Sequence, residues 1–115
     1  MALRLRSKRE FDTVYARGRR LGDGFFGAVA HSNTVGRARL GMAVAVRTAG
    51  NSVQRNRIRR IIRESFRLHQ HRLPAVDLIV SARAKARGAA PQALRSSLAA
   101  LWDKVKEQCE SSPRP

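Results

Sequence analysis

Apolar side chains recur with helical spacing between residues 51 and 67, in the stretch NSVQRNRIRRIIRESFR. When each residue turns about 100° around a helix axis, one arc holds four apolar side chains: Ile58, Ile61, Ile62 and Phe66. A separate arc is polar and holds Asn56, Arg59, Arg60, Arg63 and Arg67. Asn51 or Ser52 can cap the first turn, and the helix is predicted to run to about Gln70. We therefore expect an amphipathic helix with one buried face and one arginine face.

Two further helices are predicted towards the ends of the chain. In SKREFDTVYARG, Ser7 and Glu10 have the spacing of a capping box, and Gly18 offers a stop. The shared apolar face of this first helix consists of Phe11, Val14 and Tyr15. Pro91 suits the first turn of a last helix. Its apolar stripe consists of Leu94, Leu98, Leu101 and Val105.

Strands separated by turns are predicted between residues 19 and 46 and again after Pro74. The first is short and lies around Arg20 and Leu21, and the second is FFGAVAH. In the third, RLGMAVAV, bulky residues alternate with Gly41, Ala43 and Ala45, so one face is small and smooth. The fourth is AVDLIVSA, followed by RAKARGAA, which we interpret as a basic and flexible loop.

The predicted order of elements is α-β-β-β-α-β-α, which belongs to the α+β class. The stretch 38–82 contains strand, helix and strand, and it is long enough for a crossover between parallel strands. A chain of 115 residues can bury one modest core. We therefore predict a small single-domain α/β sandwich over residues 1–108 and a flexible tail over residues 109–115.

The chain carries a large positive charge. Lys and Arg total 24 against 8 Asp and Glu, which gives a formal net charge of +16. A polyanion relieves such self-repulsion, and guanidinium groups bind phosphates bidentately. Within residues 51–67, Glu64 is the one acid beside six arginines. The composition favours nucleic-acid binding over an ordinary solvated helix face or a helix lying on a membrane.

No pattern in the sequence predicts a catalytic or metal site in the protein itself. His69 and His71 are two residues apart and point to different faces of a helix, and His31 is far away in sequence. The single Cys109 allows neither an internal disulfide nor a zinc-finger spacing. No apolar run approaches the ~18 residues of a membrane span, and the first ten residues lack the apolar stretch of a secretory signal. We expect a cytoplasmic protein that does not bind membranes.

Phe11 and Tyr15 lie four residues apart on the predicted first helix, and their spacing allows two interpretations. Aromatic side chains on an apolar helix face are by default part of a core. Aromatic side chains among arginines can also stack on the bases of single-stranded nucleic acid. Spacing alone leaves both interpretations open.

The segment RNRIRRIIRESFR, preceded by RLGMAVAVRTAGNSVQ, closely resembles the arginine–asparagine–arginine signature of the bacterial ribonuclease P protein. LRSKREFDTVYARGRR is similar to that family's first helix, and VDLIVSARAKA to its later strand. The resemblance implies a small partner of a large catalytic RNA, in an endonuclease that removes the 5′ leader of precursor tRNA using magnesium ions. In this family the RNA makes the cut, so the protein needs no active site. The resemblance also implies a left-handed strand–helix–strand crossover, against the usual right-handed rule.

Two sets of site residues follow from the resemblance. The set placed against the catalytic RNA consists of Arg55, Asn56, Arg57, Arg59, Arg60 and Arg63, and Arg67 continues the same face. The set in the leader-binding cleft consists of Phe11, Tyr15 and Arg47. We expect the smooth face at Gly41, Ala43 and Ala45 to form the floor of this cleft. We expect a monomeric protein in a 1:1 complex with the RNA, to which precursor tRNA binds.

Two positions depart from the family pattern. Many members have two basic residues before the signature, where this chain has Val46 and Arg47 and so retains one charge. Val29 occupies a position where an aromatic side chain is common. The resemblance therefore does not carry leader contacts over to Val46 and Val29. The alternative function is a structural ribosomal protein or another RNA-binding protein without an enzymatic role.

Overall fold

The computed structural model of the chain describes residues 8–45 and 50–110. The helices within these residues are α1 (Lys8–Arg17), α3 (Ser52–His69) and α4 (Pro91–Glu110). The strands are β1 (Arg19–Gly22), β2 (Phe26–Ser32), β3 (Arg39–Ala43) and β4 (Val76–Ala82). Single turns of 3-10 helix follow α3 at Gln70–Arg72 and β4 at Ala84–Ala86. The predicted order of elements is confirmed.

The four strands form one mixed sheet in the order β1-β2-β4-β3. β2 lies antiparallel to both β1 and β4, whereas β3 lies parallel to β4. Because α3 connects β3 to β4, the predicted parallel crossover is confirmed, and with it the α+β class. The left-handed sense of this crossover stays a prediction from the resemblance.

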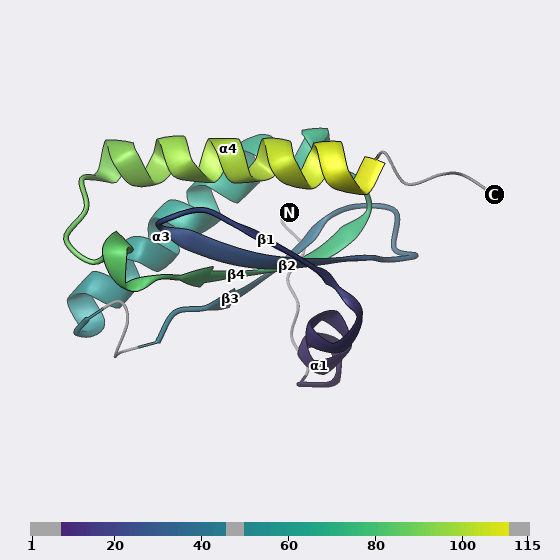
Figure 1. Cartoon of the computed structure of the whole chain (residues 1–115), viewed down its shortest axis with the longest axis horizontal. Helices are drawn as coiled ribbons and strands as arrows, with labels where there is room; N and C mark the ends of the chain where they lie inside the picture. The colour runs from purple at the N-terminus through teal and green to yellow at the C-terminus, as the bar shows by residue number, and fades with distance from the viewer. Residues whose placement is uncertain (1–7, 46–49, 111–115) are drawn as a thin grey trace.

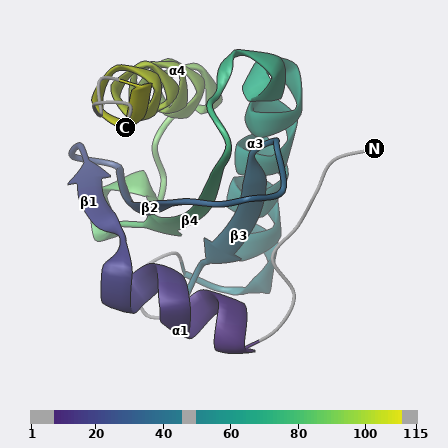
Figure 2. The ribbon, with the colours of Figure 1, turned by 90° about the vertical axis from the view of Figure 1, so that its right-hand side faces the viewer.

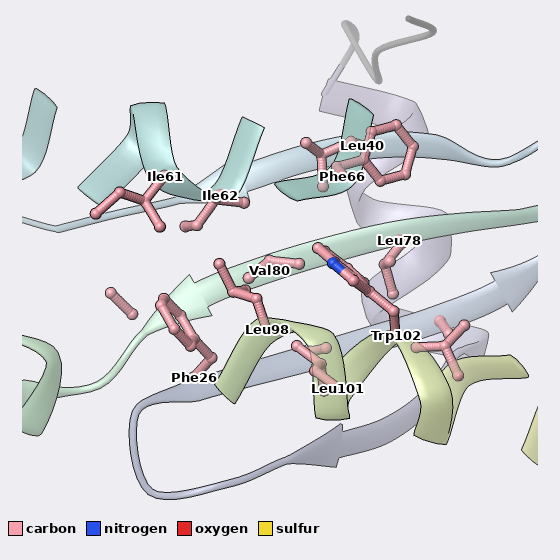
Figure 3. Packing of buried hydrophobic residues seen from close by; sticks show 14 of the residues in the cluster. Phe26, Leu40, Ile61, Ile62, Phe66, Leu78, Val80, Leu98, Leu101 and Trp102 are labelled. Carbon is pink, nitrogen blue, oxygen red and sulfur yellow. The ribbon is translucent and has the colours of Figure 1, made fainter. Parts of the chain in front are cut away.

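The sheet lies between α1 on one face and α4 on the other (Figures 1 and 2). α3 packs with α4 in one large core cluster on the α4 side of the sheet. The sheet contributes alternate residues to this cluster, including Phe26, Leu40, Leu78 and Val80 (Figure 3). The predicted apolar faces of α3 and α4 are all buried here: Ile58, Ile61, Ile62, Phe66, Leu94, Leu98, Leu101 and Val105. Hydrophobic burial therefore orients α3, and its charged face is left towards solvent.

Trp102 joins α4 to α3 in the middle of this core (Figure 3). Its side chain is 2% exposed, and its indole N–H donates a hydrogen bond to the Ser65 hydroxyl at 2.8 Å. Its ring meets Phe66 edge-on, with the ring centroids 5.9 Å apart. The one polar atom of the indole is thus satisfied inside an apolar environment, as a buried donor requires.

A small second cluster holds α1 against the other face of the sheet. Val14 of α1 packs against Val29 of β2 and Ile79 of β4, and all three are buried. Gly18 follows α1 so closely that a Cβ atom there would lie 2.5 Å from both the Val14 carbonyl oxygen and a Val29 methyl carbon. A larger residue at position 18 would push the end of α1 away from the sheet. Val29, the predicted departure from the family pattern, therefore lies under α1.

Some segment boundaries differ from the expected ones. α4 continues to Glu110, which is two residues past the predicted end of the domain at residue 108. The loop predicted to be flexible contains the turn Ala84–Ala86, whose last residue is fully buried in the core. Ser7 of the predicted capping box and the stretch 46–49, with Val46 and Arg47, lie outside the described residues.

Candidate nucleic-acid interface

The charged face of α3 is presented by a well-capped helix. The Asn51 side chain accepts a hydrogen bond from the Gln54 amide at 3.0 Å, which confirms the predicted N-cap. Arg59 is half-buried, and Asn56, Arg60 and Arg63 are exposed. The predicted separation of one apolar and one charged face on this helix is confirmed.

A groove between α1 and α3, which we call the α1–α3 groove, has a volume of about 320 Å³. Its lining combines Phe11 of α1, three residues of β3 and three of α3: Leu40, Gly41, Met42, Asn56, Arg59 and Arg63. Phe11 is half-buried there. Of the predicted small-residue floor, Gly41 lines this groove, whereas Ala43 packs against the Val14 cluster and Ala45 is exposed. An aromatic ring and two arginines therefore face one hollow.

Tyr15 lines a different groove of about 210 Å³, which we call the β2–β4 groove. Its ring is on the same helix as Phe11, and the tyrosine is 41% exposed. The floor comes from the central strands and includes Gly27, Val29, Ile79 and Ser81. Arg20 and Arg83 also line this groove, and the sequence analysis missed both as site residues. Arg83 directly follows the apolar strand and lies in the basic segment RAKARGAA, and this position could have identified it as a site residue.

A third groove of about 510 Å³ lies on the α4 side of α3, and we call it the α3–α4 groove. It is lined by Val53, Asn56, Arg57, Arg60, Ile61, Glu64, Pro91 and Arg95. Asn56 lines this groove and the α1–α3 groove. α3 is therefore a ridge between two hollows, and its arginines are divided between them.

The remaining signature residues differ in the exposure and in the hydrogen bonds of their side chains. Arg57 is half-buried, and it donates hydrogen bonds to the Ala89 carbonyl at 2.7 Å and to the Gln54 side chain at 3.4 Å. The Nε atom of Arg55 is buried, and it has no hydrogen-bond partner among the described residues. Arg67 is exposed near the C-terminal end of α3. The predicted roles of these residues and of Phe11 and Tyr15 in binding RNA stay predictions.

A charged network fixes the start of α1 beside the sheet. Arg39 of β3 donates to both carboxylate oxygens of Asp77 at 2.7 Å and to Glu10 of α1 at 3.0 Å. Asn33 adds a further hydrogen bond to Asp77 at 2.8 Å. The hydrogen bond with Asp77 raises the pKa of Arg39 above its usual value, so the Arg39 guanidinium stays charged. This network sets the position of the helix that carries Phe11 and Tyr15.

The described residues offer little that could hold a metal ion. No group of three or more His, Cys, Asp or Glu side chains within them is placed to do so. Nδ1 of His69 lies 2.8 Å from the Ser65 carbonyl oxygen, which occupies that nitrogen within its own helix. No helix in the described part of the chain is both long enough and apolar enough to cross a membrane.

Comparisons with known proteins agree with one another. The family model described as Ribonuclease P matches residues 1–106. A ribonuclease P protein component from Idiomarina loihiensis is 42% identical over 82 residues, covering 71% of this chain and 66% of that protein. One from Escherichia coli O157:H7 is 37% identical over 100 residues, covering 87% of this chain and 84% of that protein.

Solved structures of the same kind match the fold. The RNase P protein of Staphylococcus aureus superposes with a TM-score of 0.85 at 31% identity, covering 92% of this chain and 99% of that one. The RNase P protein of Thermotoga maritima gives 0.80 at 28% identity, with 89% and 96% covered. None of these relatives is a ribosomal protein, so nothing in them favours that alternative.

Proposed function

This chain belongs to the bacterial ribonuclease P protein family, and we propose that it binds the catalytic RNA through α3 and the 5′ leader of precursor tRNA beside α1. It is thus a component of an endoribonuclease of tRNA processing, and the proposal concerns how its residues contribute. The observation that carries the proposal is the α1–α3 groove, where Phe11 meets Arg59 and Arg63. An aromatic ring next to guanidinium groups suits a base and its phosphate together.

The arginine face of α3 supplies the contacts to the catalytic RNA. Each guanidinium neutralises phosphate charge and releases condensed counterions, so binding gains from the entropy of the freed ions. Arg60 and Arg63 are exposed, and neither forms an ion pair with a described residue that binding to a phosphate would break. Asn56 lies on the ridge between the two grooves, where its amide can donate and accept hydrogen bonds.

The two grooves beside α1 receive the leader. Tyr15 is exposed enough to stack on an unpaired base, and Arg20 and Arg83 are placed in the same groove to contact phosphates. Gly27 and Ser81 keep the floor of this groove low, so a flat base can approach the sheet. Stacking accepts every base, so we expect leader recognition to depend little on sequence. Arg47 is part of this proposal from the resemblance alone.

Bond cleavage is assigned to the RNA subunit, which holds the magnesium ions of the reaction. The protein acts by screening phosphates, holding the leader and so favouring the productive complex. We assign the protein to the cytoplasm as a monomer in a 1:1 complex with the RNA.

Reconstitution at low magnesium tests the proposal. Precursor tRNA is incubated with the catalytic RNA alone, with the protein alone and with both, over a series of magnesium concentrations. We expect cleavage at lower magnesium when both are present, because 24 basic residues take over part of the screening of RNA phosphates. An unchanged magnesium requirement, or strong cleavage of precursor tRNA by RNA-free protein, would overturn the proposal.

A further inference from the structure

The α3–α4 groove has its own walls and its own arginines. Val53 and Arg60 come from α3, whereas Pro91 and Arg95 come from the first turns of α4. Arg60 and Arg95 are exposed, and neither forms an ion pair with a described residue. Glu64 is the one acid in the lining, against three arginines. The groove therefore has an excess of positive charge that the described protein does not neutralise.

Arg57 fixes the shape of this groove. Its Nη2 donates to the carbonyl of Ala89, two residues before α4 begins, at a short distance of 2.7 Å. Its Nη1 also reaches the Gln54 side chain one turn earlier in α3. This bridge ties the start of α4 to α3 and so sets how far Arg95 stands from Arg60. In this groove Arg57 is a positioning residue, because its side chain is half-buried and directed towards the protein.

We propose that the α3–α4 groove is a second surface for the catalytic RNA, in which Arg60 and Arg95 bind phosphates of its backbone from opposite walls. This inference rests on the proposed function and extends the RNA contact from α3 to α4. Three arginines against one acid match a polyanion. Val53, which is 72% exposed, gives one wall an apolar surface against which a ribose or base can pack.

The position of the groove selects the catalytic RNA as the occupant. The groove lies on the opposite side of α3 from the α1–α3 groove, and α1 lies on the other face of the sheet from α4 (Figure 2). A leader held beside Phe11 and Tyr15 therefore leaves the α3–α4 groove open. The helix α3 would then contact the leader on its α1 flank and the catalytic RNA on its α4 flank.

The test is the affinity of the full-length Arg95→Ala variant for the catalytic RNA, measured without tRNA over a series of salt concentrations. Removing one phosphate contact should weaken binding roughly three- to tenfold and lower the slope of log affinity against log salt by about 1. Arg95→Lys keeps the charge and should retain most of the affinity. The matched control is Arg72→Ala, which removes an exposed arginine that pairs with Asp103 at 3.6 Å outside this groove.

The possible outcomes separate failure of the assignment of the α3–α4 groove from failure of the proposed function. If Arg95→Ala binds the catalytic RNA as tightly as Arg72→Ala does, the groove is not a contact surface. A loss of affinity in Arg59→Ala in the same experiment would show that the proposed function still stands. If Arg95→Ala weakens only the binding of precursor tRNA to the assembled complex, the occupant is the substrate and the inference is wrong. Equal melting temperatures of the three alanine variants would exclude unfolding as the cause of any loss.

Discussion

Arg39 donates two hydrogen bonds of 2.7 Å to the carboxylate of Asp77, and its third guanidinium nitrogen donates to the carboxylate of Glu10 on α1. The two residues are 38 positions apart in the chain, and both are largely shielded from solvent. The pair therefore joins β3 to β4 at the point where α1 begins its path across the sheet.

Arg39→Ala should destabilise the protein by roughly 2–4 kcal/mol, because it leaves the Asp77 carboxylate buried without its cation. The measurement is the free energy of unfolding in urea. Lys8→Ala is the control, because it removes an exposed pair with Asp12 and should change stability by about 0.5 kcal/mol or less. Equal effects of the two substitutions would mean that the Arg39 network does not hold α1.

The two faces of α3 should respond differently to substitution. Arg59→Ala and Arg63→Ala should leave the melting temperature nearly unchanged, weaken binding to the catalytic RNA and give a shallower salt dependence. Ile62→Ala should instead lower stability by roughly 2–5 kcal/mol, because Ile62 is fully buried in the core. Melting temperature and RNA affinity are measured for all three variants. Unfolded arginine variants beside a stable Ile62→Ala that only loses RNA would reverse the assignment of the faces.

Tyr15→Ala should weaken the binding of precursor tRNA to the assembled complex by roughly tenfold or more, because stacking of a base on an aromatic ring contributes about 1–3 kcal/mol. Mature tRNA lacks the leader and should bind the variant complex as well as it binds the wild type. The measurement is a pair of affinities, for precursor and for mature tRNA. Equal losses on both ligands would place the leader elsewhere.

Phe11→Ala tests the neighbouring α1–α3 groove in the same pair of measurements. The expected selectivity for precursor tRNA is the same, but a loss of stability accompanies it because Phe11 is half-buried and packs against the Val14 cluster. Urea denaturation of the free protein separates the two effects. A loss of stability without any change in precursor binding would make Phe11 a core residue alone.

Asp23 should make stability depend on pH below about pH 4. Burial raises the pKa of Asp23, but hydrogen bonds from Ser97 and from the amides of Phe26 and Phe25, with the charge of Lys104, lower it further than burial raises it. The folded state therefore holds the proton less tightly than the unfolded state. Its stabilisation is complete above the unfolded pKa and is lost as pH falls through the lower folded pKa.

The measurement for Asp23 is urea unfolding at several pH values between about 3 and 6, for the wild type and for Asp23→Asn. The wild type should be more stable than the variant at the upper end, and the difference should shrink as the pH falls. Curves that stay parallel down to the lowest pH would show that Asp23 does not contribute to the acid sensitivity.

The sequence predicted the parts of the structure that local periodicity encodes. α3 begins at its Asn51 cap and ends at His69, one residue from the predicted end, because its apolar spacing and capping residue lie within the helix itself. The apolar stripe of α4 from Leu94 to Val105 was predicted from the sequence in the same way. The hydrogen bond from Arg57 to Ala89 and the pairing of Arg39 with Asp77 were not, because each depends on how distant segments fold together.

The candidate site was likewise predictable only where it depends on local sequence. The arginine face followed from helical spacing, but its partition between two grooves depends on where α1 and α4 pack. Phe11 and Tyr15 are four residues apart on one helix, and the resemblance placed both in a single leader-binding cleft. They line different grooves because α1 crosses the sheet, so that one ring lies towards α3 and the other over β2 and β4.

Trp102 is the only tryptophan in the chain, and its indole is enclosed between α3 and α4. The protein consequently carries a single indole fluorophore, and the wavelength of its emission reports whether these two helices are packed together. Loss of the hydrogen bond to Ser65 and entry of water would shift that emission to the red. RNA bound along the arginine face of α3 would leave the indole enclosed. Fluorescence in the presence of RNA can therefore follow unfolding of the protein separately from its dissociation.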